Sequence, residues 1–491
     1  MSCFRFALMA LLAWSSAQAQ QPNLVLRGTV QGSQNNTYIE VPFDLPAKTQ
    51  RLTVSFHYTG KEEKTTLDIG MEDPHGFRGW SGGNKSSFTI SATDATPSYL
   101  PGELIPGTWK LLIGVPNIRP QTIASYEADL FFEQTAAART DSFTDAPLRR
   151  GPGWYRGDLH MHTAHSDGHC KSQTGKQVPC PVFLTLEAAR RRGLDFIAVT
   201  DHNSTSQYDA LRELQPYFDQ LLLIPGREIT TFVGHANVFG TTDFIDFRVG
   251  SNMVPNMNSL FEQAARMGAL ISINHPGAPT GEVCMGCGWQ APTDMRRVEA
   301  IEAVNGGSEE GPYSGVPFWE KQLNAGFRPT AIGGSDNHDA SLPPERAGSV
   351  GNPTTVVYAP ELSVSGILAG IRAGRVFIDL TASKDRLLDF SIQNGTARAV
   401  MGGVLHANSG DVLELSAHVL GCEGSRLRVF VDGREDPSLT PEPITSADQI
   451  VARKWGSDGT RHWLRADVVS ASGKLELLGN PIYVNLPAES H

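Results

Sequence analysis

Histidine and carboxylate residues recur in the middle of the chain at spacings that suit metal binding. Of the 14 histidines, eight fall between residues 160 and 338. In the segment GDLHMHTAHSDG, His160 and His162 are separated by one residue, and Asp167 follows them. Because residues i and i+2 of an extended strand point to the same face, both imidazoles could bind one ion. One H-x-H pair is weak support for a metal site, so the other histidines decide the question.

The same arrangement returns after four more apolar runs. The segments FIAVTDHN, LLLIPGREIT, ISINHPG and TAIGGSDNHD supply His202, Glu228, His275, Asp336 and His338, and VGHANVFG adds His235. Taken alone, each of these residues is more simply a core histidine or a capping carboxylate. In a βα barrel, however, catalytic groups lie at the C-terminal ends of the strands, so the whole set predicts a metal centre.

The elements that would position these groups are alternating strands and helices. Between Trp154 and about Leu380, short apolar runs alternate with helical stretches. The apolar runs include 196–200, 221–225 and 269–274, and the helical stretches include 185–193, 258–268 and 363–374. This alternation predicts βα units around a parallel sheet or barrel, which we assign to residues 154–385.

Short alternating segments flank this region on both sides. Residues 20–145 contain runs such as LVLRGTV, RLTVSFHY and YEADLFF between turn residues, which predict an N-terminal β-sandwich domain. A polar stretch with Gly and Pro over 138–153 is typical of a linker. Strands return over 386–491 and predict a second β domain. The expected fold is therefore multidomain, with a central barrel between two β-sandwich-like domains.

The overall composition narrows the possible partners. The chain has 491 residues, with 41 Lys and Arg against 52 Asp and Glu, and a net charge of −11. This balance argues against nucleic acid and anionic membranes as partners, although it allows a local anion-binding pocket. With 40% hydrophobic residues, the chain is long enough for two or three domains with cores of their own.

The first 19 residues resemble an export signal. Arg5 precedes the apolar run FALMALLAW, and Ala17-Gln18-Ala19 predicts cleavage before Gln20. The run is too short for a stable membrane anchor, and no later segment has about 18 uninterrupted apolar residues. We therefore expect a periplasmic or secreted protein without integral membrane association. An uncleaved signal anchor is the alternative.

Five cysteines remain after the signal is removed. Cys170 and Cys180 lie in one stretch rich in Gly and Pro, and Cys284 and Cys287 lie in another. In an exported chain, disulfides that pin these loops are favoured over structural zinc, and four cysteines allow three connectivities. Cys422 is left over and is predicted to be a buried free thiol in a β domain.

The ordered motifs HMH, SDG, TDH, GRE with a following GH, NHP and SDNH resemble the PHP (polymerase and histidinol phosphatase) superfamily of metal-dependent hydrolases. More narrowly, the signal, the GHAN segment and the flanking β domains resemble its exported carbaryl-hydrolase-type branch. The resemblance covers about residues 155–385, and the β domains match no motif. It implies a distorted seven-stranded (β/α) barrel with two or three divalent ions.

The resemblance also implies a ligand set in which every expected position is filled. One ion would lie on His160, His162, Glu228 and Asp336, a second on His235 and His275 with Glu228 as the bridge, and a third on Asp167, His202 and His338. Mixed imidazole and carboxylate ligands suit zinc, manganese or iron better than Ca²⁺ or Cu⁺. Ions held in this way would lower the pKa of a bridging water, so that hydroxide is the expected nucleophile.

Two residues beside the ligand set are candidate catalytic groups. Asp201, next to His202, could orient a ligand or pass a proton to the leaving group, and the alternative is a carboxylate that binds nearby backbone. Arg227 lies beside Glu228, where the branch often has an acidic or neutral residue. Its guanidinium could bind an anionic group of the substrate, or it could form an ordinary salt bridge.

The sequence therefore predicts a metal-dependent hydrolase, first of all a phosphoesterase acting on a small anionic molecule. The alternative within enzymes is hydrolysis of a carbamate, ester or amide, which would suit an apolar pocket lined by Phe232, Trp289, Tyr313 or Trp319. A third possibility is a non-catalytic envelope or glycan-binding protein whose barrel is only structural. No oligomeric state is predicted.

Overall fold

The computed structural model of the protein describes residues 21–83, 85–134, 146–281, 284, 286–307, 310–311, 313–439 and 443–486. The predicted signal peptide, residues 1–19, lies outside the described residues. The chain is a multidomain mixed α/β protein with one large mixed sheet and several antiparallel sheets. Its described residues divide into two compact units, 21–91 with 98–134 and 92–97 with 146–486.

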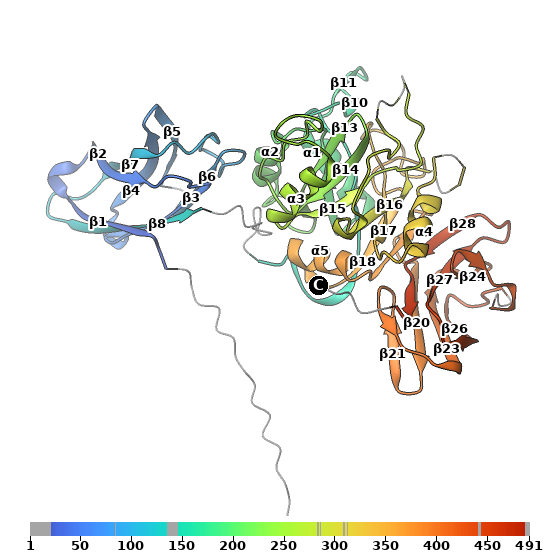
Figure 1. Ribbon diagram of the computed structural model, residues 1–491. Helices are drawn as coiled ribbons and strands as arrows, with labels where there is room; N and C mark the ends of the chain where they lie inside the picture. The colour runs from blue at the N-terminus through green and yellow to red at the C-terminus, as the bar shows by residue number, and fades with distance from the viewer. Residues whose placement is uncertain are drawn as a thin grey trace, which may run out of the picture. The chain divides into compact units, whose positions relative to one another are not determined.

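The N-terminal unit contains two antiparallel sheets of four strands (Figure 1). Their orders are β1 (Leu24–Gln31), β8 (Ile123–Glu133), β3 (Arg51–Tyr58), β6 (Ser87–Ser91) and β2 (Thr37–Leu45), β7 (Gly107–Asn117), β4 (Thr66–Asp73), β5 (Gly76–Gly82). Alternate residues of β7, such as Trp109, Leu111 and Ile113, are fully buried. Phe43 of β2 stacks on Phe132 of β8, so the two sheets share a core.

Seven neighbouring strands of the large mixed sheet surround the predicted site. In spatial order they are β9 (Arg149–Asp158), β12 (Phe196–Val199), β13 (Leu222–Thr231), β14 (Gly234–Phe239), β15 (Leu270–Ile273), β16 (Ala300–Asn305) and β17 (Thr330–Gly334). Neighbouring strands pair in parallel except around β14, which is antiparallel to both β13 and β15. The predicted βα region therefore contains a β-hairpin, because Gly234 lets the chain turn back directly after β13 at φ 147°.

The first and last of these strands meet through the residues that follow them. Met161 and Asn337 form an isolated parallel bridge. On either side of it, Asp336 N donates to His160 O at 2.8 Å and His162 N donates to Asn337 O at 2.9 Å. The ends of the seven strands consequently form a closed ring.

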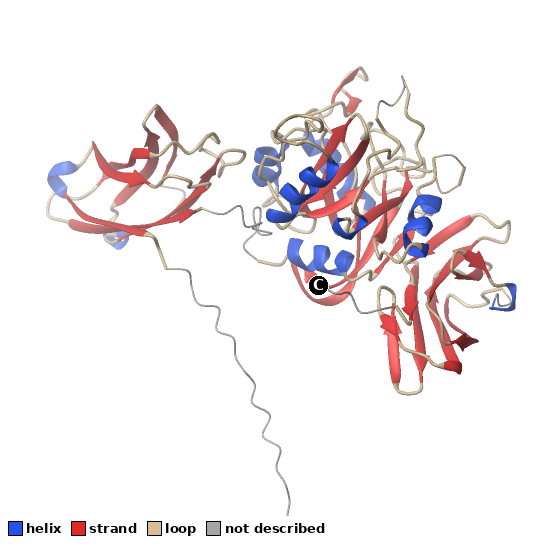
Figure 2. Ribbon diagram, viewed as in Figure 1, coloured by secondary structure: helices blue, strands red, loops and turns tan. Residues whose placement is uncertain are grey.

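Helices cover the outside of these strands, as Figure 2 shows in blue. They are α1 (Val182–Arg192), α2 (Gln207–Leu214), α3 (Met257–Arg266), α4 (Val316–Asn324) and α5 (Val364–Arg372). Asn256 caps α3 by accepting from Ser259 N at 3.1 Å. Leu260 and Phe261 of α3 are fully buried in one core with Ile271 and Ile273 of β15. The helical stretches predicted over 185–193, 258–268 and 363–374 correspond to α1, α3 and α5.

The C-terminal strands continue the same large sheet. From β9 the sheet runs through β18 (Thr354–Leu362) and β19 (Val376–Asp379) to β28 (Leu475–Gly479), β27 (His462–Val469), β24 (Arg426–Val431) and β25 (Arg434–Glu435), with β29 (Ile482–Val484) and β22 (Val404–Leu405) at its side. A separate sheet contains β21 (Ala397–Val400), β20 (Leu387–Asn394), β23 (Ser409–Leu420) and β26 (Asp448–Asp458). Phe377 and Leu388 lie in one core with Leu427, so residues 386–486 belong to the same compact unit as the βα region.

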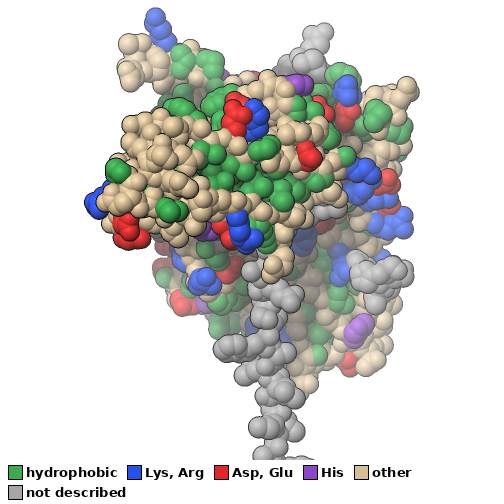
Figure 3. All heavy atoms as spheres, turned by 90° about the vertical axis from the view of Figure 1, so that its left-hand side faces the viewer, with side chains coloured by type: hydrophobic (Ala, Val, Ile, Leu, Met, Phe, Trp, Pro, Cys, Tyr) green, Lys and Arg blue, Asp and Glu red, His purple; other side chains and the backbone are tan. Residues whose placement is uncertain are grey.

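Charged side chains of both signs are interspersed on the face of the molecule that Figure 3 shows. Among the described residues, no helix has the length and apolar character needed to cross a bilayer.

Candidate metal centre

The predicted ligands converge at one place because the strands that carry them end there. His160 and His162 follow β9, His202 follows β12, His275 follows β15, and Asp336 and His338 follow β17. Glu228 lies inside β13, three residues beyond Pro225, the last residue of β13 that pairs with β12. His235 lies on β14 opposite Thr230 of the same hairpin. The hairpin thus brings a carboxylate and an imidazole to the same edge as the parallel strands.

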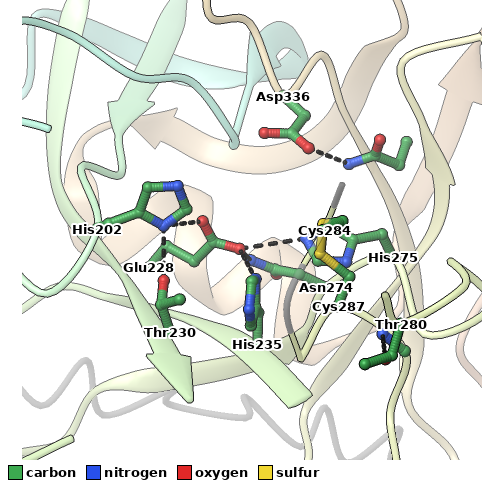
Figure 4. The surroundings of a disulfide bond; sticks show 12 residues. His202, Glu228, Thr230, His235, Asn274, His275, Thr280, Cys284, Cys287 and Asp336 are labelled. Carbon is green, nitrogen blue, oxygen red and sulfur yellow. Dashed lines mark hydrogen bonds and ion pairs between the residues drawn. A yellow bond between two sulfur atoms is a disulfide. The ribbon is translucent and has the colours of Figure 1, made fainter. Parts of the chain in front are cut away.

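Glu228 lies at the centre of the cluster and is completely buried. Its Oε1 is 3.3 Å from His235 Nδ1 and 3.2 Å from His275 Nε2. Its Oε2 is 2.8 Å from His202 Nδ1 and 3.4 Å from His160 Nε2. Figure 4 shows three of these imidazoles, His202, His235 and His275, around the carboxylate. His162 Nε2 lies 3.6 Å from the same Oε2, so five imidazoles contact this one carboxylate, which suits it to bridge two ions.

Asp336 is the second shared carboxylate. Its Oδ1 is 3.1 Å from His162 Nε2 and 3.3 Å from His160 Nε2. Asn305 donates to its Oδ2 at 3.1 Å. Asp336 has φ 50° and His275 has φ 27°, so both adopt the left-handed backbone region that non-glycine residues rarely occupy. Such conformations cost energy and cluster at functional sites.

Asp167 forms the outer part of the cluster. Its side chain is 57% exposed, and its carboxylate oxygens lie 3.4 Å from His338 Nε2, 3.7 Å from His202 Nε2 and 3.8 Å from His162 Nδ1. The imidazole of His162 stacks between those of His202 and His338, with ring centroids 4.3 and 4.1 Å away. This part of the cluster is therefore open to solvent, whereas the part around Glu228 is closed.

The donor atoms fit a group of divalent ions. Four groupings have ligand atoms within 4.8 Å of one another: His162, Asp167, His202, His338; His160, Glu228, His275; His160, His162, Asp336; and His235, His275, Cys287. When two ligand atoms each bind one ion at about 2.1 Å, they lie about 3.0–3.4 Å from each other. Many of the nitrogen–oxygen distances around Glu228 and Asp336 fall close to this range. His160 Nε2 is also buried without a hydrogen-bond partner in the described structure. Each of the nine predicted ligands belongs to at least one grouping.

The charges of the cluster are strongly coupled. Burial alone would raise the pKa of Glu228, but the imidazoles of His160, His202 and His235 outweigh it and hold this pKa well below its ordinary value. Burial would likewise raise the pKa of Asp336, and His160 and His162 lower it. The cluster therefore keeps its central carboxylates ionised, which is the state that binds a cation.

The pKa values of the imidazoles in this cluster shift in opposite directions. Burial lowers the pKa of His162. For His160, burial acts in the same direction, but Asp336, Glu302 and Glu228 outweigh it and raise the pKa well above the ordinary value. The pKa of His338 is raised to about 9, because Asp167 and Asp336 outweigh the effect of burial. A bound divalent ion would have to displace the protons that these carboxylates attract.

Glu302 is a buried residue of the site that sequence reasoning missed. It lies on β16, and its Oε1 is 2.9 Å from His160 Nδ1 while its Oε2 accepts from His275 N at 2.8 Å. The contact with Nδ1 leaves Nε2 of His160 to face Glu228 and Asp336. A metal-binding imidazole commonly has such a partner on its other nitrogen. The signal in the sequence is a single carboxylate within the apolar strand AIEAVN.

The two predicted catalytic residues lie outside the ligand groupings. Asp201 is buried and accepts from Thr163 N and Oγ1, both at 2.7 Å, and from Ser166 Oγ at 2.6 Å. It therefore fixes the loop that leads to Asp167. Arg227 alternates with Glu228 along β13 and so points to the opposite side of the strand. Its Nη2 donates to Asp243 O at 3.0 Å.

The five cysteines after the predicted signal are in two states, a disulfide and buried free thiols. Cys284 and Cys287 form a disulfide, which is one of the pairings that the sequence allowed. The disulfide expected in the other loop is absent, because Cys170 and Cys180 are buried free thiols. Burial, together with the neighbouring Cys170, raises the pKa of Cys180 to about 12. Cys422 is a buried free thiol in the C-terminal strands, as predicted.

Two of the solved structures that match this chain are both distant likenesses. A two-domain protein from Bacteroides vulgatus that contains a predicted PHP-like metal-dependent phosphoesterase is 20% identical, with a TM-score of 0.37, over 69% of this chain and 97% of that chain. A CARDB domain from Pyrococcus furiosus, in complex with di-metal ions, is 15% identical, with a TM-score of 0.14, over 21% of this chain and 97% of that chain. No protein-family model matches the sequence, and no curated protein matches it.

Proposed function

We propose that this protein is a metal-dependent phosphoesterase of the PHP type that acts on small anionic phosphoesters. The observation that carries the proposal is the sharing of Glu228 and Asp336 among imidazoles from several strands. Shared carboxylates allow two or three zinc, manganese or iron ions to lie side by side, and such ions can contact several oxygens of one phosphate group.

The strand arrangement supports a distorted seven-stranded βα barrel for residues 154–385. The strands from β9 to β17 form a ring that the Met161–Asn337 bridge closes. The antiparallel β14 is the departure from a regular βα barrel, in which all strands are parallel. The ligands lie at the end of the ring where the parallel strands finish, which is the catalytic end of βα barrels. The two β domains are proposed as accessory domains of this enzyme.

When bound, the ions would activate water and neutralise charge on the substrate. The residues of the chain would hold and orient them. Glu302 fixes the ring of His160, and Asp201 fixes the loop of Asp167. Because the Asp167 and His338 side chains are 57% and 36% exposed, a substrate would approach from their side. Arg227 lies across β13 from Glu228, which leaves the ions as the main partners for substrate charge.

Hydrolysis of an aryl carbamate or ester is the second candidate, and one residue favours it. Phe232 is 90% exposed at the turn between β13 and β14, four residues from Glu228, where an aryl group could contact it. Of the other aromatic residues considered for such a pocket, Trp319 is fully buried in the core and Trp289 stacks on Phe261. Tyr313 is 54% exposed, so Phe232 and Tyr313 are the exposed side chains among these four aromatic residues.

Metal analysis with a substrate panel tests the proposal. The purified protein should contain two or three divalent ions per chain by elemental analysis, and chelation should abolish hydrolysis of aryl phosphates. Zinc, manganese or iron added back should restore it. His165→Gln is a matched control, because His165 lies between the ligands His162 and Asp167 but contacts Ser206 and belongs to no ligand grouping in the described structure.

The other outcomes separate the alternatives. Restored activity on aryl carbamates alone would favour the second candidate. If the purified protein holds at most a trace of metal after divalent ions have been supplied, both enzymatic proposals are contradicted. This result would favour a non-catalytic binding protein. We further propose that residues 1–19 direct export to the periplasm or beyond, which N-terminal sequencing of the mature protein, expected to begin at Gln20, would check.

A further inference from the structure

A cysteine lies next to two imidazoles of the metal centre. Ligand atoms of His235, His275 and Cys287 lie within 4.8 Å of one another, and all three residues are buried. The same two imidazoles also contact Glu228, through His235 Nδ1 and His275 Nε2. Figure 4 shows the two sulfurs of the disulfide beside the His275 ring. Nδ1 of His275 is buried and has no hydrogen-bond partner in the described structure.

The backbone holds Cys287 in this position independently of its disulfide. Gly288 N donates to Thr280 Oγ1 at 2.9 Å, and Trp289 N donates to Pro276 O at 3.2 Å, directly after His275. Gly286, at φ 76°, packs so closely on the β13–β14 turn that a Cβ would lie 2.2 Å from Thr231 O. The residues on both sides of Cys287 are therefore anchored to the elements that carry His275 and His235.

The two cysteine residues of the disulfide differ in their exposure to solvent. Cys287 is completely buried, whereas Cys284 is exposed. A thiolate from outside would therefore attack the sulfur of Cys284 and leave the sulfur of Cys287 as the departing group. That departing thiolate would be released beside two imidazoles of the metal centre.

We propose that reduction of the Cys284–Cys287 disulfide frees Cys287 to join His235 and His275 as a ligand of one divalent ion. The thiol–disulfide state of this loop would then set how tightly that ion is held. The inference rests on the proposed metal centre and adds a means of regulating it. A sulfur in a disulfide is not a thiolate and does not serve as a strong ligand, so oxidation leaves that ion with imidazole and carboxylate ligands only.

The exchange balances with a dithiol as the reductant. One thiolate of the dithiol forms a bond to Cys284 Sγ, and the Sγ–Sγ bond breaks with its electron pair going to Cys287. The second thiol of the reductant then displaces Cys284, which takes up a proton, and the dithiol is oxidised to its own disulfide. The electron pair on Cys287 is donated to the metal ion.

Cobalt spectroscopy tests this proposal without measuring activity. The metal-free protein is prepared in oxidised form and in a form reduced with a dithiol, the dithiol is removed without air, and Co²⁺ is added. We expect a near-ultraviolet sulfur-to-cobalt charge-transfer band in the reduced protein only. We also expect the most weakly held ion to bind at least about tenfold more tightly after reduction, since even loss of a partner outside the ligand shell costs 10–100-fold.

Two variants separate the roles of the sulfurs. Cys284→Ser cannot form the disulfide and should show the band with or without reductant, whereas Cys287→Ser should show it in neither state. Cobalt content measured by elemental analysis separates two kinds of failure. Full cobalt content without the band in reduced protein and in Cys284→Ser would overturn this proposal alone. If no form binds cobalt, the proposed metal centre and this inference both fall.

Discussion

Two clusters in this chain place an imidazole between carboxylates, and they differ in how the groups are shared. In the C-terminal strands, His462 Nδ1 lies 2.6 Å from Asp432 and Nε2 lies 3.0 Å from Asp458. Both nitrogens of one imidazole thus have carboxylate partners of their own, and the Asp458 side chain is 60% exposed. In the strand-end cluster, by contrast, single carboxylates are shared among several imidazoles, and the central one, Glu228, is completely buried.

The difference shows what distinguishes a metal centre from an ion-pair cluster. In the His462 cluster, each carboxylate contacts a single imidazole, and the cluster belongs to no ligand grouping in the described structure. In the strand-end cluster, Glu228 contacts five imidazoles, which exceeds the roughly four hydrogen bonds that a carboxylate can accept. Sharing of ligands, rather than the presence of histidine, is therefore the feature that indicates ions.

Removing the central carboxylate should give the largest effect. Glu228→Gln keeps the shape of the side chain but removes the charge that five imidazoles contact. We expect loss of at least one ion per chain by elemental analysis and loss of hydrolytic activity. Loss of one partner from a buried charge cluster also costs about 3–5 kcal/mol, so the free energy of unfolding of the metal-free protein should fall by this order.

The matched control is the equivalent change in the other cluster. Asp432→Asn removes a carboxylate from His462. It should leave the metal content and the hydrolytic activity unchanged. If Asp432→Asn lowered the metal content as much as Glu228→Gln, the distinction between the two clusters would be wrong.

Glu302→Gln should have the next largest effect. The variant keeps a polar contact with His160 Nδ1 but loses the negative charge that orients the ring. Outer partners of this kind typically contribute 10–100-fold to metal affinity, and we expect a loss in that range by competition with a chromophoric chelator. A positioning role also predicts that excess metal restores much of the activity. Unchanged affinity would show that Glu302 serves only packing.

Regular patterns in the sequence located both the candidate ligands and several strands. Most of the nine candidate ligands lie within or just after an apolar run, and the structure brings all nine into ligand groupings. The run RLTVSFHY matches strand β3 residue by residue. The antiparallel direction of β14 was not predicted. A strand has the same local pattern of polar and apolar residues whether it runs parallel or antiparallel to its neighbours. Glu302 was missed because it lies inside a strand, and its partners His160 and His275 are distant in sequence.

The sequence pattern also did not predict that the C-terminal strands join the central sheet. It depends on the ladder between β19 and β28, in which Phe377 pairs with Gly479. A ladder between segments about a hundred residues apart leaves no periodic signal in either one. The sequence also could not show that Cys284 is exposed and Cys287 is buried. This difference depends on how the residues around Cys287 pack against the β13–β14 turn.

The pH dependence of stability should change sign when metal is bound. In the metal-free protein, the pKa of His338 is raised to about 9 from 6.5, chiefly by Asp167 and Asp336 against the effect of burial. This contribution to stability is complete below pH 6.5 and is lost as the pH rises through about 9. Metal binding requires neutral imidazole, so the metal-dependent increase in Tm should grow over the same range.

Thermal unfolding with and without chelator, from pH 6 to about 10, measures both trends. In His338→Gln, the decline of Tm in the metal-free protein should flatten. A metal-free Tm that stays constant over this range in the wild type would contradict the coupling of His338 to Asp167. In the His462 cluster no such reversal is expected, because its pH dependence does not involve an ion.

Asp458→Asn should give the smallest effect, confined to a narrow pH window. Burial would lower the pKa of His462, but Asp432 and Asp458 raise it, so this contribution to stability is present below pH 6.5 and is lost above it. Backbone and side-chain hydrogen bonds from Thr460, together with His462, lower the pKa of Asp458 from 3.8 to about 2, so its contribution is lost only as the pH falls below 3.8. The variant should therefore differ from wild type in Tm most between about pH 4 and 6.5, and the difference should shrink near pH 9, where only the Thr460 hydrogen bonds of Asp458 remain. A difference that instead grew with pH, or that vanished on chelation, would mean that this exposed cluster also depends on a metal ion.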